Sequence, residues 1–264
     1  MKKICFSLLV LSMFSVKSFA GWMFIEKKSN PQGMTTFDTI VVQNNKMRSG
    51  GKEATYIYDL DAQRITVMNN FYKTYWTGTP EAYRSGVIAG LKEQMEVIVN
   101  KMPKDKQAAA RKRLEGIMES MENPSEKSTD QNAVSVKKII DKIVVLNYNT
   151  QRYELWIEGK KKLSVWVSEK ILINGDFNLT KFNALMQRLM SSNAKLSIKS
   201  SSQYIEVLKK GYPLKTIEYM GNKEISGEVV FAKKANYPVT LFSPSAGFKM
   251  VALDVLIKSM KIKG

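Results

Sequence analysis

The stretch Ala54–Leu60, with the sequence ATYIYDL, decides the fold class. Tyr56, Tyr58 and Leu60 fall on one side of an extended chain, and the residues between them fall on the other. This alternation with a period of two is typical of a strand in a sheet that is covered on one face. The turn residues Asp61–Gln63 follow directly, so the next strand is expected to run antiparallel.

Short strands separated by turn residues lie on both sides of this stretch. Proline and asparagine in Ser29–Gly33, and asparagine at Asn44 and Asn45, favour turns. The strands expected around Ala54–Leu60 are Trp22–Ile25, Met34–Gln43, Arg64–Asn69 and Thr74–Trp76. Together they predict an antiparallel meander.

The hydrophobic period changes after Trp76. Thr79 followed by Pro80 is typical of a helix start, and Pro103 interrupts the helical pattern. Apolar residues then recur at steps of three and four, at Ile88, Leu91, Met95, Ile98 and Met102, and again at Ala110, Leu114, Ile117 and Met121. We therefore expect a helical insertion over 79–122, formed by two amphipathic helices, followed by a polar linker over 123–134.

The second half returns to strands and short helices. We expect a bent strand over Val136–Asn149, a hairpin of 153–158 with 163–168, and two long strands at Tyr212–Gly221 and Glu224–Lys234. Helices are expected at Asn178–Ala194 and Ser202–Lys210 and in the tail after Pro244. The predicted architecture is one α+β domain over residues 21–264.

The first twenty residues have the features of a secretory signal peptide. Lys2 and Lys3 precede the apolar stretch Ile4–Phe14, which is too short to span a bilayer, and small residues surround a cleavage point after Ala20. We expect export to the periplasm. The cysteine Cys5 lies within this leader and outside any lipidation pattern, so no acyl anchor is expected.

The composition excludes several chemistries. The chain has no histidine, and its one cysteine lies in the leader, so Ser-His and Cys-His catalysis and a conventional zinc site are excluded. Asp59 and Asp61 flank Leu60 before a turn, which indicates turn initiation rather than metal binding. We expect a protein that is not an enzyme and has no metal and no cofactor.

The net charge of +17 favours anionic partners. Lysine supplies most of it, whereas proteins that read bases rely on the planar fork of arginine, so nucleic acid is not expected as a partner. The positive field suits an anionic membrane surface or an acidic partner in the cell envelope.

Two sets of residues are candidate ligand contacts. The first is the methionine-rich stripe of the helical insertion, which is either core or the inner face of a lid over a cavity. The second is a pair of tryptophans in the predicted hairpin, placed diagonally across from each other with Trp156 opposite Ser164, and either covered by a helix or exposed as a ligand platform. The candidate residues are Leu91, Met95, Ile98, Met102 and Met118 in the first set, and Trp156 and Trp166 in the second.

Four stretches, taken in order, carry a resemblance to a known family. They are Tyr56–Asp61; Leu91–Met95 with Met102–Gln107; Tyr153–Trp156 with Val165–Val167; and Gly211–Leu214 with Leu241–Phe248. Together they resemble a bacterial family of exported proteins known as a domain of unknown function, itself similar to the LolA/LolB-like lipoprotein-carrier half-barrel. The resemblance implies a curved antiparallel half-barrel with helices packed on the concave face and an apolar cavity. It implies no enzyme activity and supplies no functional residue.

The expected function is therefore a non-enzymatic periplasmic protein that binds or carries an apolar ligand, either a lipid or an acyl chain. The alternative is a cell-envelope interaction protein whose cavity is filled by its own side chains and whose basic surface docks on a partner. A ligand that copurifies with the protein would separate the two.

Overall fold

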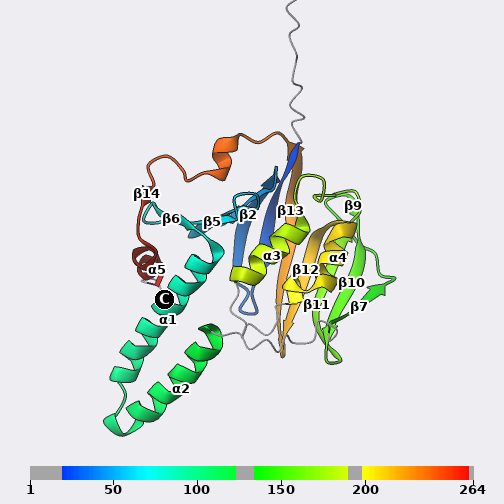
Figure 1. The fold of residues 1–264 in the computed structure, drawn as a ribbon. Coiled ribbons are helices and arrows are strands. Elements are labelled where there is room, and N and C mark those ends of the chain that lie inside the picture. The colour runs from blue at the N-terminus through cyan, green and yellow to red at the C-terminus, as the bar shows by residue number, and fades with distance from the viewer. Residues whose placement is uncertain (1–19, 123–133, 190–197, 262–264) are drawn as a thin grey trace, which may run out of the picture.

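A computed structural model describes residues 20–122, 134–189 and 198–261 of the chain. Its dominant element is one large sheet, and the five α-helices of the described residues lie beside it (Figure 1). The expected leader over 1–20, except Ala20, and the expected linker over 123–133 lie outside the described residues.

The sheet has twelve strands in the order β14-β6-β5-β4-β3-β2-β1-β13-β12-β11-β10-β7. All neighbouring strands are antiparallel except β14 and β6. The strands are β1 (Gly21–Ser29), β2 (Thr35–Gln43), β3 (Lys46–Gly50), β4 (Ala54–Asp59), β5 (Arg64–Asn69), β6 (Thr74–Gly78), β7 (Val134–Ile139), β10 (Gln151–Ile157), β11 (Lys160–Ser168), β12 (Tyr212–Met220), β13 (Lys223–Ala235) and β14 (Lys249–Met250). A separate two-stranded ladder joins β8 (Val144–Val145) to β9 (Tyr148–Asn149).

The predicted meander and the predicted hairpins are present. Strands β1 to β6 follow one another in space as they do in sequence. The second half adds β13, β12, β11, β10 and β7, and β1 pairs with β13 from Gly21 opposite Ala235 to Ser29 opposite Ser226. The two halves of the chain thus share one continuous sheet.

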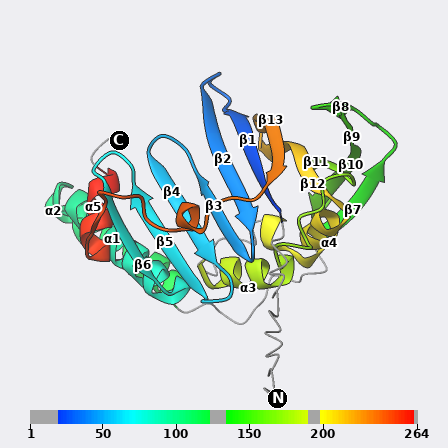
Figure 2. The ribbon, with the colours of Figure 1, turned by 90° about the horizontal axis from the view of Figure 1, so that it is seen from above.

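The sheet is curved and open, and α3 and α4 lie on the inside of its curve (Figure 2). The helices are α1 (Pro80–Asn100), α2 (Lys104–Glu122), α3 (Leu179–Leu189), α4 (Ser202–Lys210) and α5 (Leu253–Lys261), with 3-10 turns at Ile198–Ser200 and Val239–Phe242. The α+β half-barrel with helices on its concave face is therefore confirmed.

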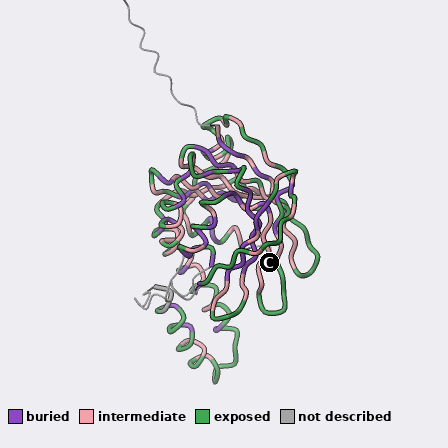
Figure 3. The backbone as a smooth tube through the Cα atoms, turned by 90° about the vertical axis from the view of Figure 1, so that its right-hand side faces the viewer, coloured by how far each residue is buried: buried purple, intermediate pink, exposed green. Residues whose placement is uncertain are grey.

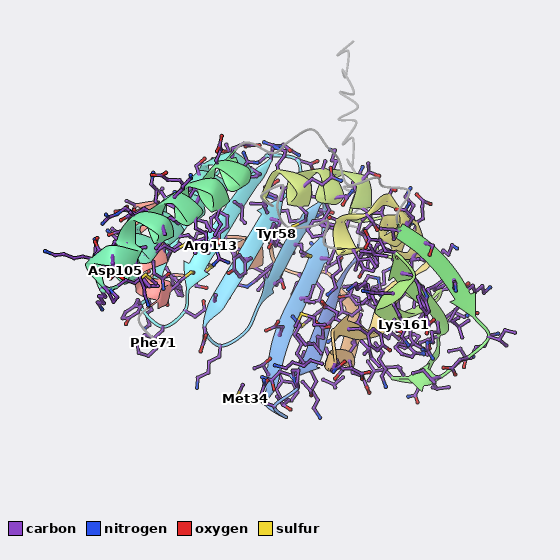
Figure 4. The ribbon with its side chains drawn as sticks, turned by 90° about the horizontal axis from the view of Figure 1, so that it is seen from below. Met34, Tyr58, Phe71, Asp105, Arg113 and Lys161 are labelled. Atoms are coloured by element: carbon purple, nitrogen blue, oxygen red, sulfur yellow. The ribbon has the colours of Figure 1, made fainter. Side chains whose placement is uncertain are left out.

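Alternating strand residues build a core on each face of the sheet. On the concave face, Phe24 is fully buried and Tyr58 meets the edge of Phe182 from α3, with ring centroids 5.8 Å apart (Figure 4). On the other face, Val41 and Ile57 pack under Phe242. The alternation in Ala54–Leu60 predicted cover on one face only, but in the structure both faces of this strand pack against a core.

The helical pair differs from the expectation. It was expected to cover the concave face, but it projects from the β6 end of the sheet and is exposed over much of its length (Figures 1 and 3). Its buried residues Ile88, Leu114 and Met118 form a cluster with Met95 alone. Beyond its first turns, where Tyr83 packs against Ile65 and Val67 of β5, the pair buries its apolar residues between its own two helices.

The base of α1 is attached to the body by charged and close contacts. Arg188 of α3 donates to both carboxylate oxygens of Glu81, one of these bonds being 2.9 Å long. Lys258 of α5 lies 3.2 Å from Glu93. A Cβ atom on Gly86 would lie 2.2 Å from a methyl carbon of Leu253, so glycine permits α5 to approach α1. Helix α1 is thus held to the body from Glu81 to Glu93, and the rest of the pair projects.

Three further boundaries differ from the prediction. The expected bent strand 136–149 is split into β7, β8 and β9. Val134, expected in the linker, is the first residue of β7. Strand β3 was not predicted, because its sequence KMRSG lacks an apolar alternation.

Candidate functional site

A cavity of about 300 Å³ lies between the concave face of the sheet and helices α3 and α4. Strands β1, β2, β3, β12 and β13 supply its floor. Its walls are mainly apolar and include Val42, Met47, Phe177, Phe182, Ile205 and Val229. It is the space that the half-barrel leaves between its two layers.

Local sequence rules position the two covering helices. Asn178 caps α3 by accepting a hydrogen bond of 2.9 Å from the amide of Lys181. Ser201 caps α4 in the same way, accepting one of 3.2 Å from the amide of Tyr204. Residues at helical spacing, such as Leu179, Phe182 and Met186 on α3, then face the cavity.

One part of the cavity wall is polar. Glu26, Thr216, Lys199 and Tyr204 line it together. The Glu26 carboxylate lies 3.5 Å from the ammonium of Lys28, and its side chain is only 18% exposed. The cavity therefore combines a large apolar surface with a small group of hydrogen-bonding side chains, as ligand pockets commonly do.

Glu26 has room in this wall because residue 227 is glycine. A Cβ atom there would lie 2.3 Å from the Oε1 atom of Glu26 and 2.9 Å from the Oγ1 atom of Thr216. Burial, and then the negative charge of Glu26, raises the pKa of Tyr204 and of Tyr212 above the usual tyrosine value. Both phenols thus stay protonated at neutral pH and can donate hydrogen bonds.

The predicted residues of the helical pair form a second site, apart from this cavity. Met95, Ile98 and Met102 line a groove of about 520 Å³ between α1 and α2. Met118 is buried beneath it and Leu91 is half-buried. No residue of α1 or α2 lines the cavity under α3 and α4, so among the described residues the pair is not a lid over that cavity.

The tryptophan pair also lies elsewhere. Helix α4 packs on the other face of the β10–β11 hairpin, so the expected helix cover is absent among the described elements. Trp156 is opposite Lys161 and not opposite Ser164, which faces Glu154, because the turn lies earlier than predicted; a bulge between Leu155 and Trp156 shifts the pairs farther from the turn by one residue. Trp166 is opposite Arg152, whose guanidinium lies 4.9 Å from the indole centroid, and Lys137 lies 4.5 Å from that of Trp156.

Asp59 serves the turn, as predicted, whereas the Asp61 carboxylate accepts from the distant residues Asn45 and Lys181. Asp59 accepts a hydrogen bond of 2.9 Å from the amide of Ala62 and lies 2.5 Å from the Lys46 ammonium. Burial raises the pKa of Asp59, but these partners outweigh it and hold the pKa below its usual value. Asp61 lies 2.8 Å from Lys181. In the described part of the chain, no cluster of three potential metal ligands occurs.

The cavity residues themselves were missed in the sequence. A signal was present: Trp22, Phe24 and Glu26 share one face of β1, which places a carboxylate in line with two buried aromatic rings. Lys199 and Tyr204 had no such signal, because their position depends on how α4 packs across β12.

The open antiparallel sheet with helices on its concave face places the chain in the class of α+β half-barrels. More specifically, the chain belongs to the DUF4412 family, a domain of unknown function, whose model matches residues 42–248. The resemblance drawn from the sequence is thereby confirmed. No match is found among the curated proteins.

Several solved structures are similar in fold. An uncharacterized conserved protein from Thermus thermophilus has 5% identity and a TM-score of 0.44, over 88% of this chain and 89% of that one. MucB, solved in complex with MucA(peri), has 7% identity and a TM-score of 0.34, over 88% of this chain and 57% of that one. A LolA superfamily protein from Nitrosomonas europaea has 8% identity and a TM-score of 0.19, over 86% and 91%. None of these similarities carries information about a ligand of this chain.

Among the described residues, no helix combines the length and the apolar character needed to span a bilayer.

Proposed function

We propose that this protein is an exported, non-enzymatic carrier that holds an apolar ligand, a lipid or an acyl chain, in the cavity under α3 and α4. The observation that carries the proposal is the cavity itself, with apolar walls and one polar group of side chains. Its volume of about 300 Å³ is at the lower end for ligand pockets, which suits one slender apolar group rather than a bulky ring system.

The polar wall supports an amphiphilic ligand. A wholly apolar molecule would lie against the Glu26 carboxylate and the Thr216 hydroxyl and offer neither a hydrogen bond, with only Lys28 at 3.5 Å to offset the charge of Glu26. A ligand with one hydrogen-bonding end satisfies them. The apolar walls then bury its tail.

The test is binding of a fluorescent fatty-acid probe to a matched pair of variants. Val229 is buried and lines the cavity, whereas its neighbour Val230 does not line it and is 40% exposed. Val229→Phe should fill the cavity and weaken probe binding by about tenfold or more, equivalent to about 1.4 kcal/mol. Val230→Phe should bind like wild type. Near-UV circular dichroism checks that both variants remain folded.

Two results would count against a carrier. One is a wild-type protein that neither binds the probe nor copurifies with a lipid in native mass spectrometry. The other is Val229→Phe binding as tightly as Val230→Phe. Either would favour the alternative function, a cell-envelope interaction protein, which the apolar groove on the projecting helical pair supports.

Export is part of the proposal and has its own test. The apolar core of the leader is short, and Ala20 precedes the first residue of β1 directly, so cleavage there would leave the sheet intact. We expect the intact mass of protein from fractionated cells to correspond to a chain beginning at Gly21. A chain that retains the first twenty residues would contradict this.

A further inference from the structure

The free end of the α1–α2 hairpin combines exposed apolar side chains with a local excess of cations. We propose that this end, residues 97–117, binds the surface of an anionic lipid bilayer. The proposal does not depend on a ligand in the cavity, because the two sites share no residue.

The apolar part is larger than the pair needs for its own packing. Val97 and Ile98 are each 51% exposed, and Met102 and Ile117 are each 40% exposed. Ile98, Met102 and Ile117 line the groove of about 520 Å³, so they form one continuous strip across both helices. A contiguous apolar strip of this kind on a water-exposed helical pair marks an interaction surface.

The charge of this end selects an anionic partner. Six of the seven charged residues between Val97 and Leu114 are basic. Arg111 is engaged within the pair, with Glu96 at 3.4 Å and the Asn100 side chain at 2.6 Å. Exposed cations therefore surround the strip, and they are Lys101, Lys104, Lys106, Lys112 and Arg113. Asp105 lies at the outer end of the hairpin (Figure 4), and Glu115 on α2 is the other acid within residues 97–117.

The position of the hairpin suits a flat surface. It projects beyond the sheet, so a plane can meet its end without contact with the strands (Figure 1). The 21 residues of α1 span about 30 Å. Glu81 fixes the first turn of α1 to α3, and Glu93, four residues before Val97, pairs with Lys258 of α5, so the body holds α1 up to the start of the free end. Apolar side chains flanked by lysines and carried on helices are the usual means of binding at the bilayer interface.

The test is cosedimentation of the purified protein with two kinds of vesicle, pure phosphatidylcholine and phosphatidylcholine containing one third phosphatidylglycerol. We expect binding to the anionic vesicles that weakens as salt is raised, because the Debye length shortens. Each lysine near such a surface contributes about fivefold in affinity. The triple variant Lys101→Gln, Lys104→Gln, Lys106→Gln should therefore bind roughly 100-fold more weakly.

Matched controls separate this surface from general charge and general hydrophobicity. The triple variant Lys142→Gln, Lys160→Gln, Lys162→Gln removes the same charge from the second half of the chain. Its affinity for anionic vesicles should stay close to that of wild type. Ile98→Ser with Met102→Ser should weaken binding by about tenfold or more. Met34→Ser with Phe71→Ser removes exposed apolar side chains from strand turns and should not weaken it.

Four outcomes would overturn the proposal: no binding to anionic vesicles, equal binding to both kinds of vesicle, equal effects of the two lysine variants, or equal effects of the two serine variants. If the protein does not bind anionic vesicles, a protein becomes the expected partner of the groove. The Val229→Phe variant separates membrane binding from the carrier function. It should bind the fatty-acid probe more weakly and still bind anionic vesicles.

Discussion

Replacing Phe24 by alanine tests how the concave core is held together. The ring of Phe24 is fully buried and stacks on Tyr212, at 3.7 Å and 5° between ring planes, and on Trp22, at 5.7 Å and 8°. Deleting a buried phenylalanine ring costs about 3–5 kcal/mol, and each lost aromatic pair is worth about 0.5–1.5 kcal/mol beyond its buried area. We therefore expect Phe24→Ala to cost about 4–5 kcal/mol. That is a large share of a typical unfolding free energy of about 5–15 kcal/mol.

Phe24→Leu separates the two contributions, because it keeps most of the buried volume and removes the stacking. It should cost about 1–2 kcal/mol. The matched control is Phe37→Ala, since Phe37 is also on a strand but is 55% exposed, and it should cost at most about 1 kcal/mol. Urea unfolding followed by tryptophan fluorescence measures all three, with the slope m fitted separately. The reasoning is refuted if Phe24→Ala and Phe37→Ala lower the unfolding free energy equally at unchanged m.

Three further predictions concern other parts of the fold. Gly211→Ala should lower the unfolding free energy by about 1–3 kcal/mol, because the added Cβ would lie 2.2 Å from the backbone oxygen of Ser168. Gly116→Ala, at a position in α2 with open space around it, should raise the unfolding free energy by up to about 1 kcal/mol. Thermal unfolding measures both, and equal effects of the two variants would contradict the prediction. Asp59→Asn should lower the unfolding free energy by about 1 kcal/mol at pH 7. This difference from wild type should vanish as the pH falls through the lowered pKa of Asp59, because a carboxyl group with a depressed pKa stabilises the fold only while it is ionised. A difference that persists at pH 2 in urea titrations would be inconsistent with this. Amides of α2 should exchange with deuterium before those of α3, because most described residues of α2 are exposed whereas most residues of α3 are buried or half-buried against the core. The reverse order would show that the hairpin is not the least stable element.

Local signals in the sequence predicted most elements. Thr79 and Pro80 do start α1, with the Thr79 hydroxyl accepting from the amide of Ala82 at 3.2 Å. Ser202–Lys210 forms α4 over the predicted residues, and Gly221 has the positive φ of 63° that the turn between β12 and β13 requires. Helix caps and turns depend on residues that are neighbours in the chain, so the local sequence is enough to predict them.

Predictions that depended on distant contacts were less successful. The period of the helical stripe shows which face of α1 is apolar but not what covers it, and Leu114 and Met118 of α2 turned out to be its partners. The residue predicted opposite Trp156 was wrong by three positions, because the hairpin turns at Glu158 and Gly159 rather than near Lys160. The cavity brings together Glu26 and Tyr204, which are separated by most of the chain, and no local period encodes that proximity.

The pairing of β1 with β13 has a consequence for how the chain reaches its folded state. The first strand of the sheet and the last long one are neighbours, so the central ladder cannot form until residues near Lys223 are available. Loop closure over such a separation is slow, and local hairpins such as β4–β5 should form first. A chain threaded through a membrane pore from its N-terminus would thus keep β1 without one of its partners until late in translocation.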